Sequence, residues 1–313
     1  MQKKATRDAY GEALVELGHE FDNIVVLEAD LSKSTKTELF AKEFPERFFQ
    51  MGIAEQDMMG TAAGLSTCNK VAFASTFAIF ATGRAFEQVR NSIAYPSLNV
   101  KICATHAGLT VGEDGGSHQA IEDIAIMRAI PNMTVIVPAD ATETAKALRA
   151  IYHYDGPVYL RLGRPAVPII YDENMNFQIG KANKLQEGQD LAIIATGIMV
   201  APALEAAEAL KKEGISVQVW DMATIKPIDK EAIIEAAKTG AILTVEEHST
   251  IGGLGSAVAE VVVGNCPVPM DFMGVEDRFG QSGTPDELLK AYGLTAENII
   301  IKAKKLFNKK SSS

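Results

Sequence analysis

The chain has 313 residues, of which 47% are hydrophobic and 22% charged, and its formal net charge is −10. This composition excludes a disordered chain, and the acidic balance argues against a nucleic-acid-binding surface. The cysteines at 68, 103 and 266 are too few and scattered for a disulfide framework or a closed zinc site, so we expect a cytoplasmic protein. Neither a signal peptide nor a run of about 20 apolar residues is visible, so no contact with a membrane is expected.

Short apolar runs alternate with longer amphipathic segments along the first half of the chain. The apolar runs predict buried strands at 23–30, 47–55, 71–76, 99–105, 134–139 and 157–163. The amphipathic segments predict helices at 6–20, 55–67, 80–95, 119–129 and 141–153. Because continuous apolar strands alternate with helices, we expect a mostly parallel sheet with helices on both faces.

The alternation breaks after Pro165, where prolines and polar residues replace the periodic positions as far as Asp190. It resumes with strands predicted at 191–197, 215–223, 241–248 and 268–277, and with helices at 200–213, at 229–238, from 253 onward and twice near the C-terminus. We therefore expect an α/β fold of two domains in series, at 1–170 and 191–313, joined by a linker at 171–190.

The loop after the strand at 99–105 is the segment richest in chemical groups. It reads THAGLTVGEDGGSHQ (105–119) and combines several glycines with His106, Asp114 and His118. Ligands bind beyond the carboxyl ends of parallel strands, and glycines let a backbone approach a ligand closely. These side chains are candidates for acid/base and hydrogen-bonding groups, or for metal binding, although their spacing fits no compact metal site. A solvated surface turn is the alternative.

Glu55 stands where a predicted strand meets a helix. Its residue pattern alone favours a carboxylate that stabilises the helix N-terminus, and a buried glutamate that takes part in proton transfer is the functional alternative. Phe77 and Phe80 lie three residues apart at another strand-to-helix junction, and this spacing by itself favours core packing.

Arg7, Arg161 and Arg164 lie beside predicted strand or helix ends, where arginines are usually solvated. Arg164 follows a buried strand and a glycine, a position suited to a bidentate contact with phosphate. The glycine-rich segment 249–258 lacks the full G-x-G-x-x-G spacing, so it predicts close strand–helix packing rather than a dinucleotide site.

Four segments together resemble the C-terminal half of transketolase. They are MGIAEQDMMGTAAGL (51–65), STFAIF (75–80), the 105–119 loop and DGPVYLRLGRP (155–165), in the order and spacing of that family. The resemblance covers essentially the whole chain and implies a pyrimidine-binding domain followed by a transketolase C-terminal domain. It implies the C-terminal subunit of a split transketolase, which transfers a two-carbon ketol unit between sugar phosphates in the pentose phosphate pathway.

The resemblance also implies roles for particular residues. Glu55 matches the glutamate that bonds the aminopyrimidine ring of thiamine diphosphate and acts as an acid/base relay. Phe77 and Phe80 match the aromatic residues that pack on that ring, and Asp30 matches an acid close to the cofactor. His106 and His118 would also move protons. The residues that match contacts to the sugar hydroxyls or phosphates are Arg7, Ser34, His106, Asp114, His118 and Arg164.

One family motif is absent from the sequence. The family anchors the diphosphate through Mg²⁺ with a G-D-G followed later by asparagine, and no G-D-G occurs in this chain. The resemblance therefore implies that an N-terminal transketolase-type subunit binds the diphosphate and Mg²⁺, and that this chain has no metal site. It also implies a heterotetramer in which two copies of this chain pair through their pyrimidine-binding domains.

Related families remain as alternatives. The β subunit of a 2-oxo-acid dehydrogenase first component has the same two domains and an equivalent glutamate, but it would not need Arg7, Ser34 and Arg164. A 1-deoxyxylulose-5-phosphate synthase shares GIAEQ and STF, but it is normally one long chain. A non-catalytic pairing subunit is the alternative of another class, and the retained Glu55 and loop histidines argue against it. The motifs leave the ketose open, including a branched or sulfonated one.

Overall fold

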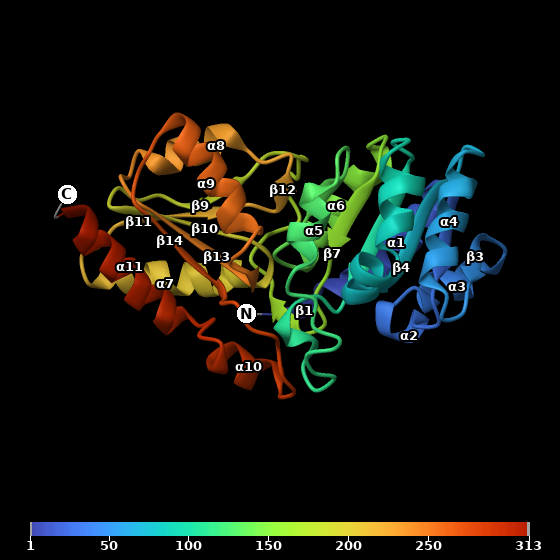
Figure 1. The fold of residues 1–313 in the computed structure, drawn as a ribbon, viewed down its shortest axis with the longest axis horizontal. Helices are drawn as coiled ribbons and strands as arrows, with labels where there is room; N and C mark the ends of the chain where they lie inside the picture. The colour runs from blue at the N-terminus through green and yellow to red at the C-terminus, as the bar shows by residue number, and fades with distance from the viewer. Residues whose placement is uncertain (1, 312–313) are drawn as a thin grey trace.

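Two sheets with helices on both sides organise residues 2–311, which are the residues that the computed structural model describes (Figure 1). The larger sheet is built mostly from the first half of the chain, and the smaller sheet is built from the second half. This arrangement confirms the α/β fold of two domains with mostly parallel sheets. Within the described residues, no helix is long and apolar enough to cross a membrane.

The larger sheet consists of β2 (Ile24–Glu28), β3 (Phe48–Gln50), β4 (Val71–Phe77), β5 (Val100–Thr105), β6 (Thr134–Ile136), β7 (Val158–Arg161) and β12 (Thr224–Lys226). Their spatial order is β12-β6-β7-β5-β4-β2-β3, and the pairs are parallel apart from β12 with β6. The helices around this sheet are α1 (Thr6–Glu20), α2 (Ser32–Thr35), α3 (Glu38–Glu43), α4 (Glu55–Ser66), α5 (Asp123–Ala129) and α6 (Ala141–His153).

The smaller sheet consists of β9 (Asn183–Gln186), β10 (Leu191–Ala195), β11 (Val217–Asp221), β13 (Ile242–Ser249) and β14 (Met270–Val275). Its order is β14-β13-β10-β11-β9, with β9 antiparallel to β11. Its helices are α7 (Val200–Lys212), α8 (Lys230–Ala237), α9 (Leu254–Asn265), α10 (Pro285–Ala291) and α11 (Ala296–Ser311). A separate antiparallel pair joins β1 (Lys3–Ala5) to β8 (Ala166–Pro168).

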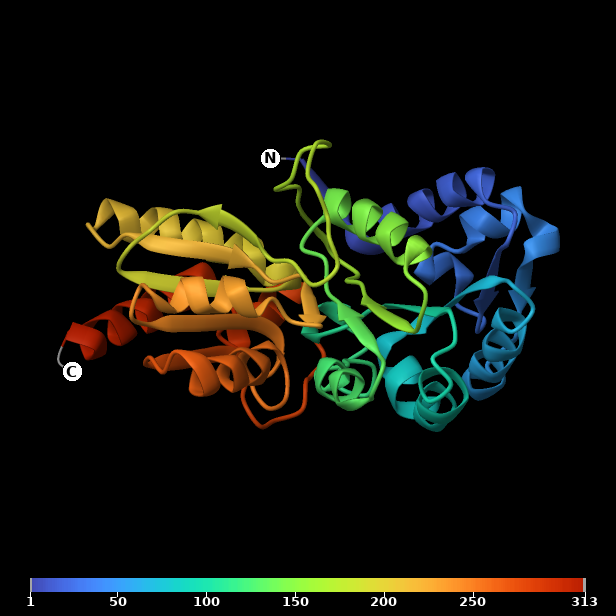
Figure 2. The same cartoon turned by 90° about the horizontal axis from the view of Figure 1, so that it is seen from above.

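Figure 2 shows helices on either side of the larger sheet, with α1 and α6 on one side and α5 on the other. The face toward α1 packs Tyr10, Leu14 and Phe40 against Phe73 of β4, and each of these side chains is fully buried. Burial of apolar side chains on both faces explains why the strands read as continuous apolar runs.

Two elements differ from their predicted form. The strand predicted at 47–55 is limited to β3, because the chain leaves the sheet after Gln50 and begins α4 at Glu55. The helix predicted at 80–95 consists of two π-helical segments, Phe80–Arg84 and Gln88–Ala94. The apolar spacing of that segment indicated a helix but not the wider turn.

Three short strands lie in or beyond the segment where the apolar alternation breaks. β8 and β9 fall between Pro165 and Asp190, and β9 lies inside the predicted linker at 171–190. β12 follows β11 of the smaller sheet, yet it pairs with β6 at the edge of the larger one, where Thr224 is opposite Ile136. The second half of the chain therefore completes the first sheet, and the two halves are directly joined.

The glycine-rich segment 249–258 connects β13 to α9. A Cβ atom on Gly255 would collide with the Phe272 ring and would lie 2.9 Å from Thr244 Oγ1. The backbone of α9 thus approaches the sheet as closely as it can, which confirms the prediction of close strand–helix packing.

Candidate active site

A cavity of about 470 Å³ opens at the carboxyl edge of the larger sheet. The side chains around it come from α1, α2, the end of β4, and the segments after β5 and β7, so they meet where parallel strands end. The lining residues are Arg7, Lys33, Ser34, Phe77, His106, Asp114, His118 and Arg164. All six residues matched to sugar or phosphate contacts are therefore brought into one cavity. Lys33 is a seventh polar residue that the sequence analysis missed, although it directly precedes Ser34.

Arg7 occupies the first turn of α1 and connects two neighbouring segments. Its Nη1 atom donates a hydrogen bond to the Ser34 carbonyl oxygen at 3.0 Å and lies 3.1 Å from His106 Nε2. The start of α1 is also held to the segment that carries Arg164, because the Gly163 N–H donates to Thr6 Oγ1 at 2.8 Å. These contacts place Arg7 over the carboxyl ends of the strands.

His106 follows β5 with a φ of +56°, an uncommon conformation for a residue other than glycine. Its ring stacks on Phe77 with a centroid distance of 3.9 Å, and its Nδ1 lies 2.9 Å from Thr105 Oγ1. Burial, followed by the positive charges of Arg7 and Arg164, lowers the pKa of His106 to about 3. The imidazole is therefore neutral at neutral pH. Because Arg7 donates to Nε2, the ring proton lies on Nδ1.

Arg164 also lines the cavity, with its side chain 35% exposed. Its Nη1 atom donates to the Val111 carbonyl oxygen and to Glu113 at 3.2 Å, and it lies 3.6 Å from Asp114. Partly exposed ion pairs of this kind are weak, so an anionic ligand can compete for this guanidinium.

An aromatic wall extends from the cavity to Glu55. The Phe77 and Phe80 rings are nearly parallel at a centroid distance of 5.9 Å, and Phe80 meets the His118 ring edge-on at 5.5 Å. Arg84 covers Phe80, with Cζ 4.5 Å from the ring centroid, and donates to both Glu55 carboxylate oxygens at 2.9 and 3.1 Å. The Glu55 side chain is 2% exposed and Arg84 is 48% exposed. The Glu55 carboxylate is thus held in place, whereas the Arg84 guanidinium is accessible to solvent.

Asp30 is the one proposed cofactor contact that neither lines the cavity nor joins the aromatic wall. It lies just beyond β2 with a φ of +64°, and its N–H donates to Gln50 Oε1 at 2.7 Å. Nearby Glu28 is fully buried, accepts a hydrogen bond from the Leu31 N–H at 2.6 Å, and has its pKa raised to about 7 by burial. The only sequence signal for Glu28 is an acid inside an otherwise apolar strand. Among residues 2–311, no three His, Cys, Asp or Glu side chains gather in a way that could bind a metal.

The glycines of the 105–119 loop pack against the second half of the chain. A Cβ atom on Gly115 would lie 2.6 Å from Ser282 Oγ, and one on Gly116 would lie 2.7 Å from the Gly280 carbonyl oxygen. A Cβ atom on Gly108 would collide with the carboxyl group of Glu247. The expectation that these glycines make room for a ligand is therefore wrong for these three positions, since they make room for protein.

The sequence matches two family profiles, described as the transketolase pyrimidine binding domain over residues 2–169 and the transketolase C-terminal domain over residues 180–299. A Methanocaldococcus jannaschii protein named as a putative transketolase C-terminal section is 58% identical and covers 95% of this chain and 94% of its own length. A 6-deoxy-6-sulfo-D-fructose transketolase subunit of a Clostridium species is 45% identical over 97% of this chain and 95% of its own. The solved structure of a split-gene transketolase, an inactive beta4 tetramer, superposes with a TM-score of 0.90 at 56% identity and covers 98% of this chain and 99% of that one. The chain therefore belongs to the transketolase family, in which it corresponds to the C-terminal section of the split enzymes.

Proposed function

We propose that this chain forms one half of a thiamine-diphosphate-dependent transketolase that transfers a two-carbon ketol unit between a ketose phosphate and an aldose phosphate. The observation that carries the proposal is the cavity, where Arg7, Lys33 and Arg164 surround neutral His106 beside an aromatic wall leading to buried Glu55. A binding site for an anionic sugar thus adjoins a site for a flat, nitrogen-containing ring.

The residues around Glu55 fit the aminopyrimidine of thiamine diphosphate. The parallel faces of Phe77 and Phe80 offer an apolar surface, and the buried carboxylate of Glu55 can hold a proton at a ring nitrogen. The Arg84 guanidinium donates a hydrogen bond to this carboxylate. Because Arg84 is partly exposed, it can turn toward solvent when a ring nitrogen binds Glu55 instead. When bound, the cofactor supplies the carbon nucleophile that accepts the ketol unit. The aromatic wall and the burial of Glu55 keep water away from this carboxylate.

The cavity residues suit a phosphorylated sugar. Arg7 and Arg164 present guanidinium groups that pair well with a phosphate, and Lys33 adds a third positive charge. His106, Asp114 and His118 offer donors and acceptors for sugar hydroxyls, with the two histidines as the groups that move protons there. The name of the Clostridium relative raises a sulfonated ketose as a second substrate class, because a sulfonate would find the same cations.

We assign the diphosphate and Mg²⁺ to an N-terminal transketolase-type partner, because this chain has no G-D-G motif. The similar split-gene transketolase is inactive as a beta4 tetramer, and that inactivity supports the need for a second kind of chain. We also propose that two copies of this chain pair through their pyrimidine-binding domains (1–170), that two partners complete a heterotetramer, and that the enzyme acts in the cytoplasm in the pentose phosphate pathway.

The test is co-expression with an N-terminal transketolase-type subunit and assay of ketol transfer with a panel of ketose phosphates, 6-deoxy-6-sulfofructose and aldose phosphate acceptors. We expect transfer only when both chains, thiamine diphosphate and Mg²⁺ are present. Glu55→Gln, which keeps the side-chain volume, should lower kcat by about 10²–10⁴-fold. Glu16→Gln, on the exposed face of α1, is the control. Oxidative decarboxylation of a 2-oxo acid, or a stable complex without turnover on any substrate, would contradict the proposal.

A further inference from the structure

The substrate loop, residues 105–119, is held by a side chain from the smaller sheet. Glu247 lies on β13 and is 3% exposed, and its Oε1 accepts a hydrogen bond from the Thr110 N–H at 2.6 Å. The same carboxyl group fills the space beside Gly108, whose φ is +79°. Glycine is needed there both for the backbone conformation and for the close approach of the carboxyl group. The carboxylate of Glu247 therefore rests directly on the loop backbone.

A second contact holds the other end of the loop. The side-chain amide of Gln119 is buried and donates to the carbonyl oxygens of Leu109 and Gln281, each at 3.0 Å. Gln119 thus ties the end of the loop to its beginning and to the segment that precedes α10. With the packing of Gly115 and Gly116, the loop between His106 and His118 is fixed from the second half of the chain.

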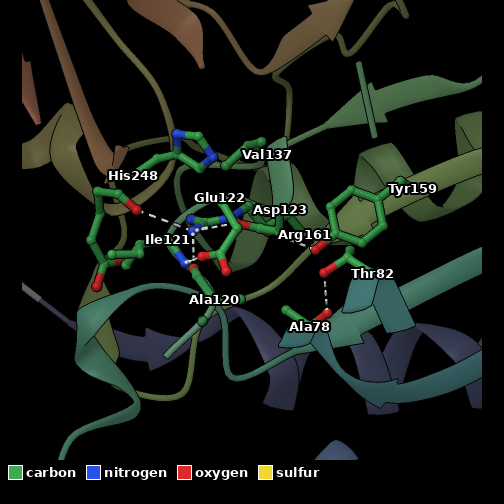
Figure 3. Close-up of polar contacts among 12 residues, drawn as sticks. Ala78, Thr82, Ala120, Ile121, Glu122, Asp123, Val137, Tyr159, Arg161 and His248 are labelled. Carbon is green, nitrogen blue, oxygen red and sulfur yellow. Dashed lines mark hydrogen bonds and ion pairs between the residues drawn. The ribbon is translucent and has the colours of Figure 1, made fainter. Parts of the chain in front are cut away.

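Glu247 is itself anchored by a buried ion pair, drawn in Figure 3. Arg161 and Asp123 form it, with Arg161 Nε 2.7 Å from an Asp123 oxygen that also accepts from the Tyr159 hydroxyl at 2.6 Å. Arg161 Nη2 donates to the Glu247 carbonyl oxygen at 3.0 Å and to the Ala120 carbonyl oxygen at 3.2 Å. The expectation of a solvated Arg161 is therefore wrong, because its guanidinium joins β7 to the backbone of β13 and to the end of the loop.

We propose that Glu247 is a positioning residue of the active site, which holds the Thr110 N–H so that the loop presents His106 and His118 to the sugar. This inference rests on the proposed function, because the loop matters only if the cavity binds substrate. A loop that is free in the unliganded protein would have to be ordered on binding, and that entropy cost weakens affinity. Loss of the Glu247 carboxylate should therefore raise KM more than it lowers kcat.

Glu246 provides a matched control for Glu247. It is the preceding residue on β13, is 1% exposed, and accepts hydrogen bonds from the N–H groups of Leu254 and Gly255 at 2.7 and 2.8 Å. Successive residues of a strand point to opposite faces. Glu246 therefore holds the start of α9 and not the loop. Its removal tests whether a general loosening of the second half of the chain also exposes the Thr110 amide and raises KM.

The first measurement is hydrogen–deuterium exchange of the chain itself, which does not depend on the proposed activity. In Glu247→Ala, exchange of the Thr110 amide should become at least about tenfold faster, because its buried hydrogen bond to the Glu247 carboxyl oxygen is lost. Glu247→Gln keeps an acceptor oxygen and should stay within about threefold of the wild type. Glu246→Ala should affect the start of α9 and leave Thr110 protected. Unchanged exchange at Thr110 in Glu247→Ala would overturn the proposal.

The second measurement uses the complex with the N-terminal-type subunit. We expect Glu247→Ala to raise KM for the sugar phosphate about tenfold with kcat within about threefold, and Glu247→Gln to restore both. Equal effects of Glu246→Ala and Glu247→Ala on KM would also overturn the proposal. Absence of ketol transfer in the wild-type complex would instead reject the proposed function. If Glu247→Ala does not fold, Glu247→Asp, which withdraws the carboxylate by one methylene, takes its place with the same criteria.

Discussion

At the scale of single residues, His106 shows how the site controls charge before any ligand binds. Its ring is buried against Phe77 and faces the guanidinium groups of Arg7 and Arg164. Burial and both cations disfavour the imidazolium, so the ring acts as a neutral hydrogen-bonding group. An anion bound to the two arginines would offset their charge, so we expect His106 to become more basic when a phosphate enters the cavity.

The first prediction concerns this coupling. Arg164→Ala should raise the pKa of His106 from about 3, since one of the positive charges that oppose protonation is removed. The pKa should remain below the ordinary value of about 6.5, because burial is the largest cause of the shift. NMR titration of the imidazole C2 proton measures it. Arg149→Ala, which removes an exposed ion pair with Glu20, is the control. An unchanged His106 pKa in Arg164→Ala would show that Arg164 does not influence the protonation of this imidazole.

The sequence located most of the cavity because its residues follow strand ends. His106 and Arg164 each come shortly after an apolar strand, and parallel strands bring such positions to one edge. Arg84 and Glu247 could not be located in this way. Arg84 reaches Glu55 from a π-helical segment, and Glu247 comes from the other sheet, at a separation of 137 residues from Thr110. Contacts between segments that are distant in sequence leave no local periodicity.

At the scale of elements, the close approach of α1 to α3 depends on small residues. A Cβ atom on Gly18 of α1 would lie 2.5 Å from the Phe44 ring and 2.7 Å from the Phe40 ring. Phe40 is fully buried in the core between the helices and the sheet. By contrast, a Cβ atom on Gly60 of α4 would meet nothing within 4 Å. Close packing between helices therefore requires glycine at position 18, whereas no neighbouring atom in the described part of the chain requires it at position 60.

The second prediction contrasts these two glycines. Gly18→Ala should lower the free energy of unfolding by about 1–3 kcal/mol, because the added methyl group forces the phenylalanine rings apart. Gly60→Ala should raise it by about 0.5–1 kcal/mol, because alanine costs less backbone entropy in a helix. Urea unfolding monitored by circular dichroism gives both values. Destabilisation of similar size in both variants would contradict the argument from packing.

Long apolar or amphipathic segments were predictable, and short edge strands were not. The helix predicted at 6–20 coincides with α1, since its amphipathic pattern runs over four turns. β12 has three residues and β9 has four, and each pairs with only one neighbour at a sheet edge. Such strands depend on a partner that is distant in sequence, so their own residues carry little signal.

At the scale of the whole molecule, a buried pair of carboxyl groups lies between the two halves of the chain. Glu143 of α6 accepts the Ala139 N–H at 2.7 Å, and Asp221 of β11 accepts the Tyr171 hydroxyl at 2.8 Å. The remaining carboxyl oxygens, Glu143 Oε1 and Asp221 Oδ1, are buried without a hydrogen-bond partner among the described residues, and burial raises the pKa of both groups above its ordinary value. The pair therefore retains a proton at a pH where an exposed pair would have lost it.

The third prediction follows from this retained proton. The native pKa values exceed those of the unfolded chain, so between about pH 4.5 and 7 the native state binds more protons than the unfolded state, and raising the pH lowers stability. The slope is about 1.4 kcal/mol per pH unit for each extra proton. Glu143→Gln should flatten the dependence of the urea midpoint on pH between 5 and 8 relative to the wild type. The exposed control Glu16→Gln should give a curve parallel to that of the wild type. A parallel curve for Glu143→Gln would show that the carboxyl pair does not cause the pH dependence of stability.

The fourth prediction concerns what the chain lacks as a whole. The aromatic wall and Glu55 can contact an aminopyrimidine, but the diphosphate carries most of the cofactor's charge, and no G-D-G motif is present to hold it through Mg²⁺. Calorimetric titration of thiamine diphosphate with Mg²⁺ into this chain alone should therefore show negligible binding. Addition of the N-terminal-type partner should produce tight binding, which Glu55→Gln weakens. Tight binding to this chain alone would refute a cofactor site shared between two chains, because among residues 2–311 no three His, Cys, Asp or Glu side chains gather to hold the Mg²⁺.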